Sequence, residues 1–176
     1  MKILPITLPI TIVAPQIHLI NAGLLTCLFR PLGGTLDRLQ AGDCLWVREP
    51  FVLPKDFDHF SPTAAAGLIA GPLFTTGAIT GHLQPGRPRF ARELLRAWHR
   101  QHLRVTRIER RRLQAITPGE IQAQGYALAE SFAEAWDRNL SLTKASAQRW
   151  SENPHALAIH FDRVAAPVDA QLGEAA

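Results

Sequence analysis

The chain has 176 residues, of which 47% are hydrophobic, and carries a net charge of +4 at pH 7. This length and composition fit one globular domain over residues 1–176 with a hydrophobic core of its own. No apolar run approaches the length of a membrane span, so we expect a cytoplasmic protein without a membrane partner.

The cysteines and histidines give no sign of a metal or cofactor site. Cys27 and Cys44 match no zinc spacing and form no CxxC pair. His99 and His102 lie three residues apart but have no third ligand near them in the sequence. We therefore expect no metal, no cofactor and two reduced thiols, with a single disulfide as the alternative.

The first predicted element is an edge strand near the N-terminus. Residues 1–15 begin with a lysine and an apolar run, as signal peptides do, but their three prolines break any continuous helix. Proline among isoleucine and threonine is typical of an edge strand. A short helix is predicted over 15–23, with proline at its start and Gly23, in a positive-φ conformation, after its end.

Two further strands and a loop region are predicted next. Residues 24–34 indicate a short strand or turn that runs into a loop. Residues 41–51 follow a turn and alternate, which places Leu45, Val47 and Glu49 on one face of a strand and Cys44, Trp46 and Arg48 on the other. Residues 52–88 hold five prolines and several glycines and predict a long, irregular, variable loop region.

The middle of the chain predicts a helix followed by a strand. Over 90–103, Leu94, Trp98 and His102 fall on one side of a helix. Residues 103–112 then fit a strand. Period-two alternation sends its arginines to two faces, with Arg104, Arg110 and Arg112 on one and Arg107 and Arg111 on the other.

The C-terminal part predicts two helices and a last strand. Thr117 and Glu120 form a capping box, and the helix that follows stops at Gly125. A helix over about 128–140 is expected to bury Leu128, Phe132 and Trp136, and residues 156–164 alternate as a strand. The element order predicts an α+β fold, with a small mixed or closed sheet and short helices at its rim.

Arginine is concentrated in one part of the chain. Residues 86–112 carry a net charge of +8, so the remainder of the chain carries −4. Sixteen arginines against three lysines favour phosphate binding, because the planar guanidinium donates two parallel hydrogen bonds and stacks on bases. This local concentration favours a nucleic-acid partner. The alternative is a solvated strand whose arginines pair with acidic residues of the same chain.

Four stretches, in order, resemble the ASCH domain of the PUA-like superfamily, in particular its phage and prophage branch. They are "INAGLLTCLFRP", "GDCLWVREP", "RVTRIERRRLQAITPGEIQAQGYA", and "FAEAWDRN" with "WSENPHALAIHFDRV". In the first stretch, Gly23 and Arg30 keep the spacing of the family's G-x-K-x-x-[E/T]-x-R pattern. The resemblance implies a PUA-like β-barrel, a mostly antiparallel or mixed small barrel, with a cleft beside the first helix that binds RNA or modified bases.

The family's catalytic positions are replaced in this chain. The branch that hydrolyses acetylated cytidine uses a lysine, a threonine and a glutamate where this sequence has Leu25, Leu28 and Gln124. Leucine is neither a base nor a nucleophile, and glutamine does not exchange a proton at neutral pH. We therefore expect no catalytic residues and a binding module. The alternatives are a hydrolase with a rearranged site, either a nuclease or an amidohydrolase, and a phage accessory protein that binds a host protein.

The expected site combines the resemblance with the arginine concentration. Several positions have a second interpretation: Arg30 as a surface arginine, Trp46 as a core residue, and Arg48 and Glu49 as members of an intramolecular ion pair. Trp136 and Trp150 are assigned to the core. The residues expected to contact nucleic acid are Arg30, Arg48, Arg87, Arg89, Arg92, Arg104 and Arg107. Those expected at the cleft are Gly23, Thr26, Trp46, Glu49 and Gln124.

Overall fold

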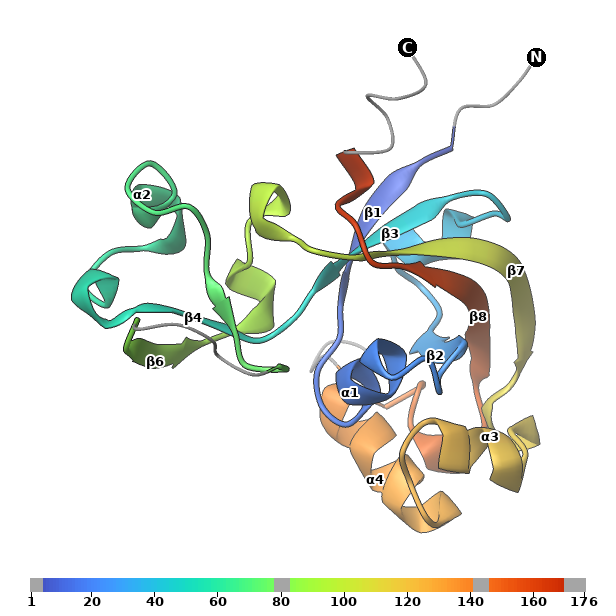
Figure 1. Cartoon of the computed structure of the whole chain (residues 1–176). Coiled ribbons are helices and arrows are strands. Elements are labelled where there is room, and N and C mark those ends of the chain that lie inside the picture. Colours follow the sequence, from blue (N-terminus) through green and yellow to red (C-terminus); the bar gives the residue numbers. More distant parts are fainter. Residues whose placement is uncertain (1–4, 78–82, 141–145, 170–176) are drawn as a thin grey trace.

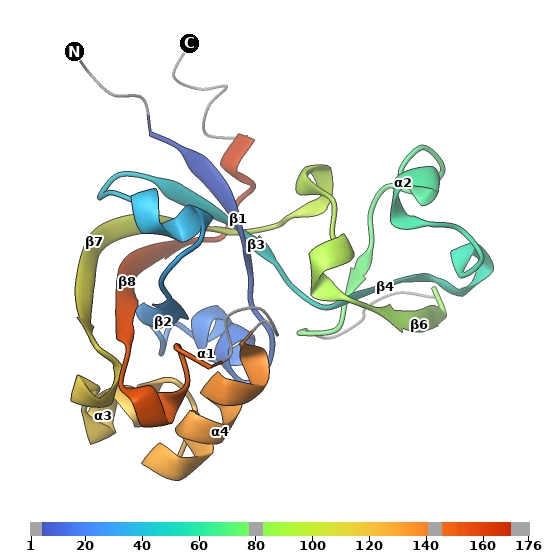
Figure 2. The ribbon, with the colours of Figure 1, turned by 180° about the vertical axis from the view of Figure 1, so that it is seen from behind.

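The structure is a computed structural model that describes residues 5–77, 83–140 and 146–169. The chain forms an α+β fold with two sheets. A curved five-stranded sheet has the strand order β1-β3-β7-β8-β2, and a smaller three-stranded sheet has the order β5-β4-β6. Figure 1 shows the small sheet projecting from one side of the large one, and Figure 2 shows the same arrangement from behind. The predicted fold class is therefore confirmed at the level of α+β.

The large sheet is mixed and remains open. Strand β1 runs parallel to β3, while the other neighbouring pairs are antiparallel. Strands β1 and β2 are its two edges and do not pair with each other in the described residues, so the sheet curves without closing into a barrel. Its strands are β1 (Thr7–Thr11), β2 (Cys27–Pro31), β3 (Cys44–Arg48), β7 (His102–Arg112) and β8 (His155–Val164). The edge strand expected near the N-terminus and the last strand are both confirmed.

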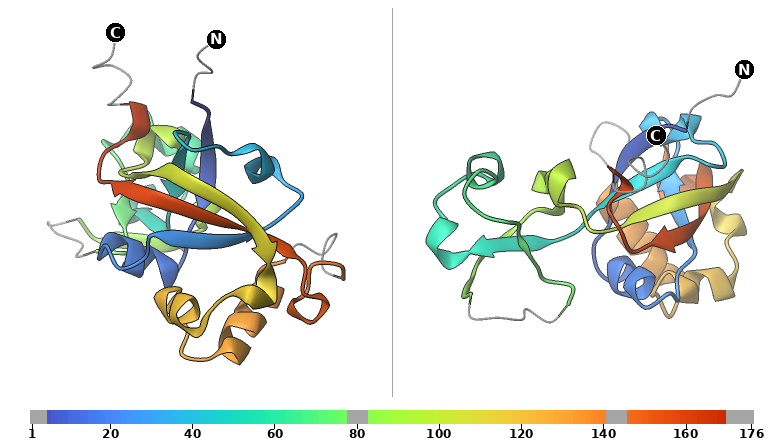
Figure 3. Two further views of the ribbon diagram at one scale, coloured as in Figure 1. Left: turned by 90° about the vertical axis from the view of Figure 1, so that its right-hand side faces the viewer. Right: turned by 45° about the horizontal axis from the view of Figure 1, so that its top comes forward.

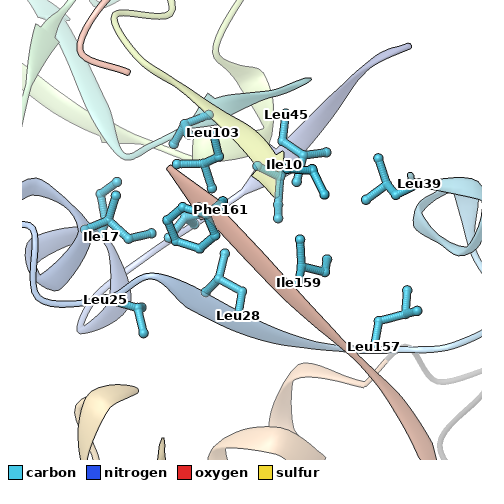
Figure 4. Packing of buried hydrophobic residues seen from close by; sticks show 14 residues of the cluster. Ile10, Ile17, Leu25, Leu28, Leu39, Leu45, Leu103, Leu157, Ile159 and Phe161 are labelled. Atoms are coloured by element: carbon cyan, nitrogen blue, oxygen red, sulfur yellow. The ribbon is translucent and has the colours of Figure 1, made fainter. Parts of the chain in front are cut away.

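A hydrophobic cluster fills the concave side of this sheet. Figure 4 shows side chains from β1, β2, β3, β7 and β8 meeting those of α1 (Gln16–Asn21). Leu25 and Leu28 belong to this cluster and are 2% and 0% exposed. Gly23 follows α1 with φ +72°, the conformation predicted for it. The 3-10 turn η1 (Thr35–Arg38) lies between β2 and β3.

A second cluster on the opposite face packs α3 (Pro118–Ala123) and α4 (Ala129–Asn139) against the sheet (Figure 3). The predicted capping box at Thr117 is confirmed, because both of its hydrogen bonds are present. Phe132 and Trp136 are buried as predicted, but Leu128 is 64% exposed. The prediction for Leu128 is wrong because this residue is the extended N-cap of α4 and so lies ahead of the buried helical stripe. The 3-10 turns η5 (Leu113–Ala115) and η6 (Trp150–Glu152) complete this end.

The small sheet forms within the region that the sequence analysis treated as a loop. It holds β4 (Phe51–Pro54), β5 (Leu73–Phe74) and β6 (Pro85–Arg89), with α2 (Pro62–Ala65) and the 3-10 turn η2 (Lys55–Phe57). Two of the prolines that indicated a loop, Pro85 and Pro88, lie on β6, an edge strand, where a missing N–H is tolerated. Residues 78–82 of the predicted loop lie outside the described residues.

The helix predicted over 90–103 is wrong. The segment contains two 3-10 turns, η3 (Ala91–Glu93) and η4 (Arg96–Trp98), separated by an extended backbone at Leu94. Leu94 and Trp98 are buried in the cluster of the small sheet, whereas His102 begins β7 in the large sheet. The apolar spacing mimics a helical stripe, but its residues belong to two different packing sites.

Within the described residues, no helix has both the length and the apolar character that crossing a membrane requires.

Candidate functional site

A cavity of about 350 Å³ lies where the large sheet fails to close. Thr11 of β1 borders one side, Arg30 of β2 borders the other, and α4 covers it. Its volume lies within the range of small-molecule sites. Its lining consists of Thr11, Val13, Ala14, Gln16, Phe29, Arg30, Pro31, Tyr126, Phe132, Ala135, Trp136 and Asn139.

Arg30 contributes the positive charge of this cavity. Its Nη1 donates a hydrogen bond of 2.8 Å to the carbonyl of Phe29, and Nη1 and Nη2 approach Gln16 Oε1 at 3.4 and 3.3 Å. Burial lowers the pKa of Arg30 to about 10, an effect that Tyr126 partly opposes. Arg30 forms no ion pair with a carboxylate in the described residues. At neutral pH the cavity therefore holds a half-buried cation without a counter-ion among the described residues.

A chain of two glutamines fixes the orientation of Arg30. Gln124 ends α3 and is 1% exposed; its Nε2 donates to the carbonyl of Cys27 at 2.6 Å, and its Oε1 accepts from Gln16 Nε2 at 2.8 Å. Because a backbone carbonyl only accepts, Gln124 must turn its oxygen toward Gln16. Gln16 must then present its own oxygen to Arg30. The backbone of β2 thereby sets the direction of the guanidinium.

Aromatic rings form much of the remaining wall. Phe132 of α4 meets Phe29 edge-on with ring centroids 6.5 Å apart and Tyr126 with centroids 5.5 Å apart. Trp136 lies beside Phe132 at 6.2 Å and donates its indole N–H to the carbonyl of Gln148. A cavity with aromatic walls and one guanidinium suits a planar ligand that carries hydrogen-bond acceptors.

None of the residues expected at the cleft lines this cavity. Gly23 ends α1, and Thr26 is exposed, with its carbonyl accepting from the amide of Phe161. Trp46 is buried against His99, at 5.6 Å between centroids. Gln124 acts on the cavity through Gln16, and Glu49 lies elsewhere in the fold.

Leu25 and Leu28 do not line the cavity either. Both side chains point into the concave core, where Figure 4 shows them among Ile17, Ile159 and Phe161. Two of the three positions that the resemblance assigns to catalysis are thus occupied by packed alkyl groups. No polar group at these positions faces a ligand.

Glu49 belongs to an intramolecular network at the junction of the two sheets. Its carboxylate is fully buried and accepts from Arg100 Nε at 2.9 Å and Nη2 at 2.7 Å. Thr76 and Gln101 also donate to it. The intramolecular ion pair expected as an alternative for Glu49 is therefore present. Its partner is Arg100, whereas the guanidinium of Arg48 lies 4.7 Å from the ring of Trp46.

The predicted faces of the arginine-rich strand are wrong because β7 contains a β-bulge. Its register against β8 shifts between Val105 and Arg107, so the residue between them has no partner and the alternation reverses. Val105 and Ile108 consequently contact the same core, opposite Phe161 and Ile159. The two faces as observed hold Arg104, Arg107 and Arg111 on one side and Arg110 and Arg112 on the other.

The structure divides the predicted phosphate-contacting arginines between the two sheets. Arg87 and Arg89 lie on β6 and Arg92 on η3, at the small sheet, while Arg104 and Arg107 lie on β7 (Figure 1). The predicted set is therefore spread over elements of both sheets.

Four arginines of the concentrated segment pair with carboxylates of the same chain. Arg96 pairs with Asp169, Arg100 with Glu49, Arg107 with Glu109 and Arg111 with Glu120. Three others donate to backbone carbonyls: Arg89, Arg110 and Arg112. Arg87, Arg92 and Arg104 are exposed and form no ion pair in the described residues. The internal pairing weighed as an alternative thus accounts for part of the segment, and these three exposed arginines remain available for a polyanion.

Cys27 and His160 form a contact that the sequence did not suggest. Cys27 Sγ lies 3.8 Å from His160 Nε2, and the same nitrogen faces Arg107 at 3.1 Å. Burial raises the pKa of Cys27 to about 11 and lowers the pKa of His160. Cys27 is therefore a neutral thiol, unsuited to nucleophilic attack. Both cysteines are free, and the described residues contain no group of three or more histidine, cysteine or acidic side chains placed to hold a metal.

Several polar and aromatic wall residues were not predicted as site residues. They include Gln16, Tyr126, Phe132 and Trp136, of which the last two were assigned only to the core. Tyr126 is the single tyrosine of the chain and directly follows the glycine after α3. This position gave the only local signal in the sequence that one of these residues belongs to the site. No family model, curated protein or solved structure matches the chain, so its function is inferred from these residues and their geometry.

Proposed function

We propose that this chain is a nucleic-acid-binding module that seats one nucleotide of a single-stranded RNA in the cavity at Arg30. We further propose that its curved sheet is a PUA-like barrel of the ASCH kind, left open between β1 and β2. The resemblance of the sequence motifs and the position of the cavity beside α1 support this assignment.

One observation carries the proposal: a half-buried guanidinium without a carboxylate partner in the described residues faces a cavity lined with aromatic rings. Burying an unpaired charge is costly unless a partner arrives to pair with it. An RNA nucleotide supplies acceptors for the guanidinium and a planar base for the aromatic wall. Base–aromatic stacking adds about 1–3 kcal/mol per base in proteins that bind single strands.

The exposed arginines supply the second part of the interface. Arg87, Arg92 and Arg104 are exposed without an ion pair in the described residues, so they can neutralise phosphates along the strand. These contacts hold a polyanion without reading its sequence. Binding rather than hydrolysis is favoured because Leu25 and Leu28 are buried in the core.

The test is a titration of a fluorescent single-stranded RNA with the wild-type protein, Arg30→Ala and Arg30→Lys, at fixed salt. Loss of a charge-assisted hydrogen bond in the cavity should weaken binding about 10- to 150-fold. Arg30→Lys should bind nearly as weakly as Arg30→Ala, because lysine keeps the charge but lacks the planar fork.

Arg104→Ala provides the matched control on an exposed position, and it should weaken binding much less at the same salt. All variants must first show the same folded circular-dichroism spectrum. If Arg30→Lys binds like the wild type, the cavity is not a recognition site. If the wild type binds neither the RNA nor DNA of the same sequence, the chain is not a nucleic-acid-binding module.

A further inference from the structure

Arg30 has one edge of its guanidinium occupied and another edge free. Both Nη1 hydrogens are engaged, one by the Phe29 carbonyl and one by Gln16 Oε1, and Gln16 Oε1 also takes one hydrogen of Nη2. The described residues supply no partner for Nε–H or for the remaining Nη2–H. These two donors are parallel, because Nε–H and Nη2 lie on the same side of the planar group.

The same edge binds pairs of acceptors elsewhere in this chain. Arg100 donates Nε–H and Nη2–H to the two carboxylate oxygens of Glu49 at 2.9 and 2.7 Å. Arg96 holds Asp169 in the same way at 3.1 and 2.6 Å. The free edge of Arg30 is therefore suited to two adjacent acceptors on one ligand, with no donor between them.

We propose that the nucleotide in the cavity is a guanosine, read by Arg30 through O6 and N7 of the guanine base. This inference rests on the proposed RNA-binding function and names its base. Guanine presents two acceptors side by side on this edge, and arginine is the side chain that pairs with them bidentately. Adenine replaces the first acceptor with an amino donor, and uracil offers one acceptor beside a carbon.

The fixed direction of Arg30 makes this edge selective. Gln16 Oε1 holds the end of the guanidinium, and Gln124 holds Gln16 in turn through the carbonyl of Cys27. A rotated guanidinium would lose its bonds to Phe29 and Gln16, so it does not adapt freely to a base with a different acceptor pattern. The aromatic rings of Phe29 and Phe132 provide apolar surface for a purine.

The test uses a short uridine-rich RNA with a single variable base, titrated by fluorescence anisotropy. Replacing guanine with 7-deazaguanine removes only the N7 acceptor and should weaken binding about 5- to 150-fold. Inosine keeps O6 and N7 but lacks the exocyclic amine, so it should bind like guanine. Adenine should bind at least as weakly as 7-deazaguanine. Arg30→Ala should bind all four RNAs alike.

The outcomes separate this inference from the proposed function. If all four RNAs bind the wild type equally and Arg30→Ala weakens them all, Arg30 contacts the RNA without reading the base: RNA binding stands and the guanine assignment is overturned. Cytosine also carries two adjacent acceptors, O2 and N3. Tighter binding of an RNA with cytosine at the variable position would therefore also overturn the guanine assignment. If none of the RNAs binds, both the proposed function and the guanine assignment fail.

Discussion

Replacing Arg30 with methionine is expected to stabilise the protein while abolishing binding. Burial lowers the pKa of Arg30 from its usual value to about 10, so the folded state holds the proton less well than the unfolded state does. The resulting penalty is fully present below pH 10 and disappears only as the pH rises toward the unfolded value. A fall of this size corresponds to at most about 3 kcal/mol of unfavourable free energy at neutral pH.

Methionine removes the charge and keeps most of the apolar stem. It also removes the hydrogen bond to the Phe29 carbonyl, which offsets about 1 kcal/mol because water from the cavity can replace the lost donor. The free energy of unfolding should therefore rise by about 1–2 kcal/mol. For a chain of this length, the midpoint of thermal unfolding should rise by about 2–8 °C.

Arg100→Met is the matched control, because this arginine has the carboxylate that Arg30 lacks. Its removal leaves the fully buried carboxylate of Glu49 without its counter-ion. Removing one partner of a buried ion pair costs about 3–5 kcal/mol. The assay is thermal and urea unfolding of the three proteins at neutral pH, followed by circular dichroism. A midpoint for Arg30→Met clearly below that of the wild type would refute the reasoning, because the charge would then be stabilised in its place.

Three further predictions concern salt, chemistry and backbone. Three phosphates neutralised by exposed arginines imply a slope of about −2 when the logarithm of the RNA affinity is plotted against the logarithm of the salt concentration. Changing Arg87 and Arg104 together to alanine should reduce the magnitude of this slope by about 1.4. An unchanged slope would show that other residues bind the phosphates. The purified protein should release no acetate from acetylated cytidine above background, since Leu25 is packed in the core, and turnover that persists through purification would contradict this. Gly125→Ala should lower the free energy of unfolding by about 1–3 kcal/mol, because φ is +90° at this position and a Cβ would lie 2.8 Å from Pro15 Cγ. An unchanged midpoint of urea unfolding would contradict this prediction.

Elements with local signals were predictable from the sequence. The capping box at Thr117 satisfies its hydrogen bonds within four residues, and Gly125, which ends α3 with a positive φ, is an equally local signal. Phe132 and Trp136 recur at helical spacing and are buried accordingly. In each case the deciding interaction lies close by in the sequence.

Features that depend on distant partners were not predictable. The bulge in β7 is visible only in its register against β8, and it reversed the predicted faces of the arginines. Leu94 and His102 have helical spacing but pack in different sheets. These misassignments arose because tertiary packing overrode a local periodicity.

The candidate site was predictable only at Arg30. Its spacing from Gly23 marked it, whereas its partners come from α1 and α3: Gln16 is 14 residues away, and Gln124 bonds to Gln16 across 108 residues. Nothing in the sequence near Arg30 reveals that it lacks a carboxylate. That property appears only when the surrounding side chains are placed.

The most direct test of the central claim is to observe the Nε–H group of Arg30 itself by nuclear magnetic resonance. In a ¹⁵N-labelled sample, its resonance is assigned by its disappearance in Arg30→Lys and is then followed as single-stranded RNA containing guanosine is added. We expect this signal to shift and to exchange more slowly with water, because an acceptor on the base occupies the free edge of the guanidinium. A titration in which the Nε–H signals of Arg87 and Arg104 shift while that of Arg30 does not would contradict the account.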